Sequence, residues 1–557
     1  MFGAWAATLS APSVGTEPDK ERQPPSAATP LDFPVYNLLD ATENEAECTL
    51  DDLYHDLASI KRPQDISAER FRSLNLKVES DIPASHIVPE ACQGSSPPLP
   101  WENAPPRDPA DEPILMENQN PYPSNERFEV VKNELLLDND DAFREVGRLA
   151  PREGRQRVRV TQTRKFWTGL ERMAQYWDTS LDNYYERPAT PRQTPDEETG
   201  DKMQVDDQIQ ASKGAEKSDT SMEVDNPPAT QAAGDKPQPE EESGRPSVAV
   251  YTGRRHGTGS EMPEDARDET IRAFAEMAAW PFGCQVTVPM IPPRLTVKSM
   301  LFPVRHSFFS ARSPKDRQLA RSGIMEGPIL VAQCRTETSF RGPEEAPGSG
   351  IGEISDIYRE VGGMLLAAQE RAREGSTEVR PGEGQWWTTT PRWGGAPNDG
   401  MEEETSNEED KPTAETMKAR KRSKFDHPFT ASRRPGAPRK LTNNEKWKLV
   451  QPGPSLWDRR MRYIQLGKNR ESAFDDIYML SSINHHLAIL HLRVHRRYLD
   501  IVTTGSSDFP AVSDVPDQPW HVLKLRRTRW YNLFDVKDRI EAFEGVWGIF
   551  HHSVRKP

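Results

Sequence analysis

The sequence predicts an α+β protein in which mixed α/β core blocks are joined by extensive intrinsically disordered linkers and preceded by an N-terminal helical segment. The linkers are predicted by composition, because only 34% of the 557 residues are hydrophobic, 50 are proline, and the mean hydropathy is -0.80. Such a chain cannot bury enough apolar surface to order all of itself. The folded blocks are predicted by 13 Trp and 19 Phe and by stretches with helical or strand periodicity.

Several classes of protein are disfavoured by what the sequence lacks. It has no run of about 18 apolar residues, so it predicts no transmembrane helix and no membrane partner. The apolar start at residues 1–9 is short and has no basic residue, unlike a secretory signal peptide. The four cysteines form no CxxC pair, which argues against a disulfide scaffold or zinc ribbon and favours the nucleus or cytosol.

The first third of the chain divides into four stretches of different composition. Residues 1–45 are predicted to be disordered, and residues 46–79 to form a short helical segment. A Pro-rich linker is predicted over 80–124, followed over 125–185 by a helical segment with basic and aromatic residues. In the short helical segment, apolar residues recur on one helical face, at Leu50, Leu53, Leu57 and Ile60. A second short helix is predicted over 68–78. The two helices are expected to form a small hairpin that docks on the main core; alternatively, the apolar face of the first helix binds a partner protein.

The stretch at 125–185 combines basic and aromatic residues. It predicts a helix over 125–150, then a strand in which Arg155, Arg157 and Arg159 share one face, then a helix over 166–185 with an aromatic stripe. Aromatic residues beside a basic run can stack on nucleic acid, but a stripe at helical spacing is more often part of a core.

The acidic stretch 186–247 contains no Phe, Trp, Tyr or Leu and is predicted to be a disordered linker. The block that follows, 248–395, reads as α/β. It is predicted to begin with a helix over 263–280, a strand over 284–288 and an extended stretch over 294–310. A second strand over 327–340 and a long helix over 351–373 follow.

The last block, 443–557, follows a linker at 396–442 that is first acidic and then basic. Strands are predicted over 476–480, 487–494 and 520–529, and a final amphipathic helix is predicted over 536–554. We expect the final helix to pack on a sheet, because one of its faces is strongly apolar. The two α/β blocks are each small, and a single core interrupted by the linker is one arrangement that the pattern allows.

A compact basic cluster is the most specific signal in the sequence. Residues 411–440 hold ten Lys and Arg against two acidic residues. Short clusters of this kind in polar sequence are typical of nuclear localisation signals. The alternatives are a solvated linker or nonspecific contact with nucleic-acid phosphates. The residues of the cluster are Lys418, Arg420, Lys421 and Arg422, followed by Arg433 and Arg434.

A second basic group is predicted in the last block. If residues 487–494 form a strand, His491, Arg493 and His495 share its outer face. Together with Arg526, Arg527 and Arg529 they predict a basic face that binds phosphate or an acidic partner, or is merely solvated. We predict no metal site, because the neighbouring arginines would repel a cation.

No catalytic motif stands out. The glycines of Gly348–Gly352 lie before a helix, but Glu353 replaces the small residue of a dinucleotide-binding turn, which favours a plain turn. No GxSxG, P-loop or EF-hand pattern occurs, so neither catalytic residues nor a cofactor are predicted.

These observations favour a non-enzymatic nuclear scaffold or regulatory protein that binds other proteins of a chromatin- or transcription-related complex. The alternatives are an enzyme with a nonlocal active site for a phosphorylated or nucleic-acid substrate, and a direct nucleic-acid binder. Cytoplasmic residence is the alternative localisation.

Overall fold

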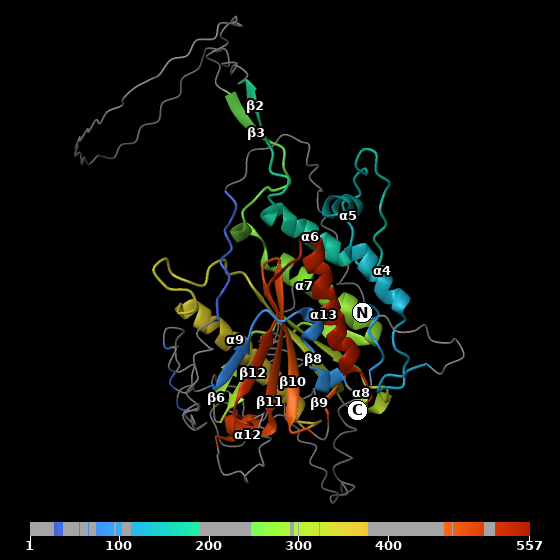
Figure 1. Ribbon diagram of the computed structural model, residues 1–557, viewed down its shortest axis with the longest axis vertical. Helices are drawn as coiled ribbons and strands as arrows, with labels where there is room; N and C mark the ends of the chain where they lie inside the picture. The colour runs from blue at the N-terminus through green and yellow to red at the C-terminus, as the bar shows by residue number, and fades with distance from the viewer. Residues whose placement is uncertain are drawn as a thin grey trace, which may run out of the picture.

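The computed structural model confirms the α+β fold class: helices pack on both faces of a mixed β-sheet (Figure 1). The residues that it describes are 27–36, 55, 59, 65, 74–93, 96–102, 113–188, 247–289, 294–298, 300–321, 323–376, 462–469, 472–505 and 519–556.

One mixed sheet is the centre of the described structure. Its nine strands are β1 (Leu76–Glu79), β4 (Cys284–Thr287), β7 (Phe308–Arg312), β8 (Ile324–Arg335), β9 (Arg462–Ile464), β10 (Phe474–Ile483), β11 (His486–His495), β12 (Leu523–Arg527) and β13 (Tyr531–Asn532). Seven follow the order β1-β12-β11-β10-β8-β7-β4, while β13 pairs with β11 and β9 with β8. The pairs β1–β12, β8–β10 and β8–β9 are parallel and the others antiparallel.

Strands from the two α/β blocks lie side by side in this sheet. Strand β8 comes from the block at 248–395 and β10 from the block at 443–557, and Leu330 lies opposite Tyr478. A parallel pair needs a long crossover connection, and helix α9 (Ile351–Ala372) lies within it. The two blocks therefore share one sheet.

Five helices lie on one side of the sheet. Helices α7 (Glu264–Ala279) and α13 (Val536–Ser553) pack on the strands. Outside them lie α4 (Asn125–Leu135), α5 (Asn139–Val146) and α6 (Arg164–Trp177) (Figure 1). Phe543, Val546, Trp547 and Phe550 of α13 are fully buried. The aspartate before the helix, Asp535, caps it by accepting a hydrogen bond from the Asp538 N–H at 3.0 Å.

The other face of the sheet is covered by α9 and by α12 (Arg496–Thr504), together with the hairpin of β5 (Arg294–Val297) and β6 (Met300–Pro303). Helix α9 lies very close to the strands at Gly363, where an added Cβ would stand 2.7 Å from Nε2 of Gln333. A larger residue there would push the helix away from the sheet.

The remaining elements are short. A hairpin of β2 (Tyr184–Pro188) and β3 (Ser247–Tyr251) projects from the body (Figure 1), so the linker predicted at 186–247 leaves and re-enters the fold at paired strands. The others are α3 (Glu90–Gln93), α8 (Arg317–Arg321) and the 3-10 turns η3 (Ala84–His86), η4 (Gly259–Glu261) and η5 (Trp280–Phe282).

The long elements predicted from periodicity are confirmed. The predicted helices at 263–280, 351–373 and 536–554 correspond to α7, α9 and α13. The predicted strands correspond to β4, β8, β10, β11 and β12. Their boundaries move by a few residues, and the extended stretch 294–310 divides into β5, β6 and the start of β7.

The helix predicted over 125–150 is wrong in its extent, because the chain forms two helices there. Helix α4 ends at Leu135, and α5 begins after Asp138, whose side chain accepts a hydrogen bond from the Asp140 N–H at 3.0 Å. An aspartate that bonds a nearby backbone N–H favours a new helix start over continuation of the old helix. The following aromatic helix also ends early, at Trp177, but its stripe is core as expected.

The helix predicted over 68–78 is also wrong at its end, where β1 forms instead. Leu76 and Val78 are buried, whereas Lys77 and Glu79 are exposed, so this stretch has the period of two that belongs to a strand. Pairing with β12, more than 400 residues later, stabilises the strand, and no local signal announces that partner.

Parts of the two predicted N-terminal linkers are integral to the fold. In the Pro-rich stretch 80–124, Ile87 and Met116 are buried in the core beneath α13. In the stretch 1–45, the backbone N–H of Val35 donates to Glu353 of α9 at 2.9 Å, and Phe33 stacks on Trp530 at 5.4 Å. A few apolar residues spaced between prolines are enough to bind an existing surface, although the only helices described in these two stretches are the short η3 and α3.

Candidate functional site

Ten predicted site residues lie outside the described part of the chain. They are the basic residues Lys418, Arg420, Lys421, Arg422, Arg433 and Arg434 and the apolar residues Leu50, Leu53, Leu57 and Ile60. Within the segment that holds the four apolar residues, His55 and Ser59 are described, and both are helical and exposed.

The basic stretch before α6 is not the strand that alternation predicts. Its arginines bind carboxylates of α5 instead: Arg155 lies 2.6 Å from Asp141 and Arg157 lies 2.6 Å from Glu145. Any nucleic-acid phosphate would have to compete with these internal ion pairs. The geometry therefore weakens the case for nucleic-acid binding at this stretch.

The predicted basic face does not form on β11. His491, Arg493 and His495 do share one side of the strand, but it is the side that faces α7 and α13. His491 and His495 are 1% and 5% exposed. The prediction treated this side as solvated because sequence alternation cannot reveal that helices cover both faces of a sheet.

The three arginines predicted to join this face also separate. Arg526 pairs with Glu79 of β1 at 3.3 Å, and Arg529 pairs with Asp538 of α13 at 2.7 Å. Arg527 is buried on the opposite face of the sheet. Successive strand residues point to opposite faces, so Arg526 and Arg527 cannot act on one ligand.

His491 belongs to a buried polar cluster. Its Nε2 lies 2.7 Å from Oδ1 of Asp476, and the thiol of Cys92 donates to Oδ2 of the same carboxylate at 3.0 Å. Burial opposes ionisation of Asp476, but the hydrogen bond and charge of His491 outweigh it and lower the pKa of Asp476 to about 2. Burial and the neighbouring Asp476 raise the pKa of the Cys92 thiol well above its usual range.

This cluster is arranged for structure rather than for nucleophilic catalysis. A cysteine nucleophile needs a thiolate and a base within hydrogen-bond reach. Here the carboxylate lies between the thiol and the imidazole, and it favours the protonated thiol. The adjoining cavity measures only about 10 Å³, the space of a single water molecule.

A second buried polar cluster, which we call the ionic cluster, joins α9 to the opposite face of the sheet. Arg335 of β8 binds both carboxylate oxygens of Asp356 at 2.8 Å and binds Glu360 at 3.0 Å, and Arg527 of β12 binds Glu360 at 3.1 Å. Tyr36 donates its hydroxyl to Asp356 at 3.3 Å. All five side chains are buried, so two cations and two carboxyl groups are enclosed together.

The charges of the ionic cluster support each other. Burial acts to raise the pKa of Glu360, but Arg527 and Arg335 outweigh it and hold that pKa below its ordinary value. Both guanidinium groups also lie over the ring of Trp530, at 4.7 Å and 5.7 Å from its centroid. The cluster thus ties β8, β12, α9 and the N-terminal segment together.

The glycine-rich turn before α9 is closed by its own glutamate. Glu353 accepts hydrogen bonds from the Gly348 and Gly350 N–H groups at 2.7 Å and 3.2 Å, and from Val35. These are the donors that a bound phosphate would need at a helix N-terminus. The turn therefore acts as a helix cap, as the sequence favours.

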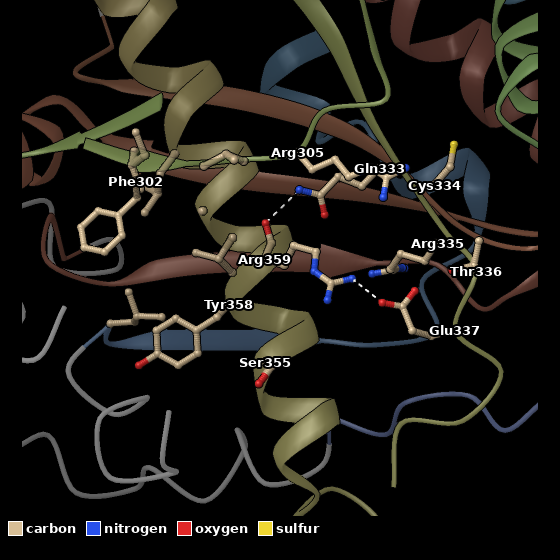
Figure 2. Close-up of a pocket in the computed structure, with 16 residues that line it drawn as sticks. Phe302, Arg305, Gln333, Cys334, Arg335, Thr336, Glu337, Ser355, Tyr358 and Arg359 are labelled. Atoms are coloured by element: carbon tan, nitrogen blue, oxygen red, sulfur yellow. Dashed lines mark hydrogen bonds and ion pairs between the residues drawn. The ribbon is translucent and has the colours of Figure 1, made fainter. Parts of the chain in front are cut away.

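A pocket of about 540 Å³ lies next to the ionic cluster (Figure 2). Its walls come from α9, the end of β8, the β5–β6 hairpin and Leu74, two residues before β1. The apolar wall residues are Leu74, Leu295, Phe302, Val304, Val361 and Leu365. The charged residues around it are already paired: Arg359 lies 3.2 Å from Glu337, and Arg305 lies 3.2 Å from Glu264.

Some polar atoms of the residues that line the pocket have no hydrogen-bond partner within the described structure. Gln333 donates its Nε2 to the Arg359 carbonyl at 3.0 Å, as the dashed line in Figure 2 shows, and its Oε1 is buried without a donor. The hydroxyl of Ser355 on α9 and Nε of Arg335 are likewise buried and unbonded. Because these atoms are buried, they lie behind the surface of the pocket wall rather than on it.

Sequence reasoning missed this pocket, although Val361 and Leu365 lie on the helix that it predicted over 351–373. The available signal was Gln333, an amide in the apolar run Ile329–Cys334, because a buried polar residue in a core strand needs a partner. The contribution of Leu74 and Leu295 could not be read locally, because they come from distant parts of the chain.

Comparison of the chain with protein families, curated proteins and solved structures finds no match. Among the described residues, no group of three or more His, Cys, Asp or Glu side chains is placed to hold a metal ion. Nor does that part of the chain contain a helix long and apolar enough to cross a membrane.

Proposed function

We propose that this protein is a non-enzymatic nuclear interaction protein, acting as a scaffold or regulatory subunit of a chromatin- or transcription-related assembly. The observation that carries the proposal is the cluster Lys418–Arg422, which lies in a polar stretch, residues 411–440, with ten basic and two acidic residues. Accessible clusters of this kind are read by nuclear import receptors through their charge.

The chemistry of the described core supports a binding role over catalysis. A catalytic acid, base or nucleophile has to reach a substrate. Asp476 is instead engaged by His491 and Cys92, and Glu360 by two arginines. These groups are held in internal hydrogen bonds and ion pairs, so they are not free to act on a substrate.

The import role is tested by imaging the full-length tagged protein. Replacing Lys418, Arg420, Lys421 and Arg422 with Gln should move the protein from the nucleus to the cytoplasm. A matched variant that exchanges Lys for Arg and Arg for Lys at the same positions keeps the charge and should remain nuclear. A Gln variant that stays fully nuclear would refute this role for the cluster.

The interaction role is tested by affinity purification of the same tagged protein from its native cells. Near-stoichiometric recovery of subunits of one nuclear assembly is the expected outcome. Recovery of the protein alone, from a cytosolic fraction, contradicts the proposal and would make the enzyme hypothesis the one to pursue.

A further inference from the structure

Residues 27–36, which we call the arm, lie against the folded core as an extended segment (the dark-blue segment beside α9 in Figure 1). The arm contains no helix or strand, and Pro30 and Pro34 favour an extended backbone. Only Pro34 and Tyr36 are buried, while the other side chains are half-buried or exposed. The arm therefore lies on the surface of the core in the way that a bound peptide does.

The acidic and aromatic residues of the arm are bound by the connections that follow β8 and β12. Asp32 pairs with Arg341, whose Nε lies 3.1 Å from its carboxylate, and the Asp32 N–H donates to the carbonyl of Thr338 at 2.8 Å. Phe33 stacks on Trp530, with the ring centroids 5.4 Å apart. A cation and an aromatic ring thus recognise an acidic residue and the aromatic residue after it.

The end of the arm is bound through a backbone N–H and a tyrosine. The Val35 N–H donates to the Glu353 carboxylate at 2.9 Å. Tyr36, which is 8% exposed, donates its hydroxyl to Asp356 at 3.3 Å. The centroid of its ring lies 4.4 Å from the guanidinium of Arg527. The site therefore has a partner for the ring of a tyrosine and another for its hydroxyl.

The residues that bind the arm also have partners of their own in the core. Arg341 lies 3.4 Å from Glu353, and Glu353 accepts hydrogen bonds from the Gly348 and Gly350 N–H groups. The ionic cluster pairs two arginines with two carboxyl groups, so its charges balance without Tyr36. Departure of the arm would leave no buried charge unpaired, which is the condition that makes a buried charge most costly. A second peptide would find its binding groups already in position.

The arm is joined to the core as a tethered peptide is joined to its receptor. Residues 37–73 connect it to Leu74, and a connection of this length spans on the order of 100 Å when extended. The arm can therefore leave its site without disturbing β1. While it is tethered, it competes with a free peptide at an effective concentration on the order of 1 mM.

We propose that the groove beneath the arm is a recognition site for an extended segment of a partner protein, and that the arm occupies this site in cis as a competitor. The matching segment carries an aspartate, an aromatic residue, a proline, any residue and a tyrosine, in the order of Asp32–Tyr36. This inference rests on the interaction role proposed above, because it names the chemistry of one partner, but it does not depend on nuclear import. A synthetic peptide tests it, so it can fail while the import and co-purification experiments succeed.

The probe is a fluorescein-labelled peptide with the sequence of residues 27–36, and its binding is measured by fluorescence polarisation. It is added to the full parent chain and to the full chain carrying Phe33→Ala and Tyr36→Ala, which weaken the arm in cis. We expect the double variant to bind the probe at least about tenfold more tightly, because its own arm competes less. A labelled peptide with the same two alanines should not bind. Circular dichroism verifies that the double variant folds.

Two arginines make this test specific. Arg341→Ala in the double variant removes the cation that pairs with Asp32, so it should weaken the probe about tenfold. Arg317→Ala removes the same kind of side chain from the exposed helix α8 and should leave the affinity unchanged.

A second experiment keeps the parental sequence of the arm, so it stands even where the double variant does not fold. A recognition sequence for a site-specific protease is inserted after residue 45, and the full chain is then cleaved there. Native mass spectrometry should show that the piece with the arm stays bound to the core. An excess of unlabelled 27–36 peptide should displace it and take its place.

Four results would overturn the inference. The folded double variant binds no probe, or it binds the probe no more tightly than the parent chain does. The cleaved piece leaves only when the core unfolds, which would make the arm an integral part of the core. The parent chain forms a dimer that the double variant does not form, in which case a second copy of this chain supplies the segment.

Discussion

The two faces of the central sheet are packed in different ways. Beneath α7 and α13 the core is dominated by aromatic rings: Phe128 stacks on Phe543 at 5.5 Å, and Phe282 meets Trp547 edge-on at 5.0 Å. Beneath α9 the core is mostly aliphatic, with Phe309, Tyr463 and Tyr498 among its few rings, and it encloses the ionic cluster and lies next to the pocket.

The difference shows how the side chains between a helix and the sheet decide whether a cavity remains there. Large rings from α4, α13 and η5 meet at one place and fill the space between layers. On the other face, α9 is held at a set distance by buried charges and by Gly363, whose absent side chain admits Gln333 and His306. A helix positioned in this way leaves room beside it at Gly362.

The largest expected effect comes from breaking the ionic cluster. Glu360→Ala leaves Arg335 and Arg527 without their shared carboxylate, and loss of one partner of a buried ion pair costs about 3–5 kcal/mol of unfolding free energy. Urea unfolding followed by circular dichroism measures it. Glu264→Ala, which removes an exposed pair with Arg305, should cost less than about 1 kcal/mol. Equal losses for both variants would mean that burial of the cluster is unimportant.

A smaller effect is expected from adding volume to the aromatic face. Ala542 of α13 is fully buried in that core, so Ala542→Leu should lower the unfolding free energy by about 1–3 kcal/mol through overpacking. The same urea experiment measures the change. If the variant is as stable as the parent protein, the aromatic face contains unfilled space and the contrast between the faces fails.

The pH dependence of stability is expected to reflect buried histidines on both faces. Burial lowers the pKa of His306 to about 4, below the usual value of about 6.5. The unfolded chain therefore takes up a proton that the folded protein refuses, and stability falls as the pH drops from about 6.5 to 4. Each such histidine contributes a slope of up to about 1.4 kcal/mol per pH unit.

Burial also lowers the pKa of His486 to about 4 and, on the face covered by α13, that of His552 to about 3. Urea unfolding at several pH values measures the total slope, and His306→Gln and His552→Gln should each reduce it. An unfolding free energy that rises on acidification would contradict the expected sign.

The smallest effect is expected at the two adjacent glycines of α9. Gly362→Ala should raise the unfolding free energy by about 0.5–1 kcal/mol, because alanine is the better helix former and its Cβ meets open space. Gly363→Ala should lower it, because the new Cβ would lie 2.9 Å or less from Gln333, Met479 and His306. Thermal unfolding compares the two, and equal effects would show that α9 is not held close to the sheet.

Periodicity in the sequence was sufficient to predict the long elements. Helices α7, α9 and α13 and strands β10 and β11 each bury most of one surface, and burial at a regular spacing leaves a pattern that neighbouring residues carry by themselves. The same periodicity predicted the α+β fold class. The cap at Asp535 is a local signal of the same kind, because its hydrogen-bond partner is only three residues away.

The functional geometry depended on contacts between distant residues. Strand β1 exists because β12 pairs with it, His491 is buried because α13 covers its side of β11, and Arg527 meets Glu360 only after α9 folds over the sheet. In each case the two contacting residues are far apart in the sequence, so a pattern among neighbouring residues cannot predict the contact. The pocket follows from the same cause, since its wall joins Leu74, Leu295 and Gln333, which only tertiary packing brings together.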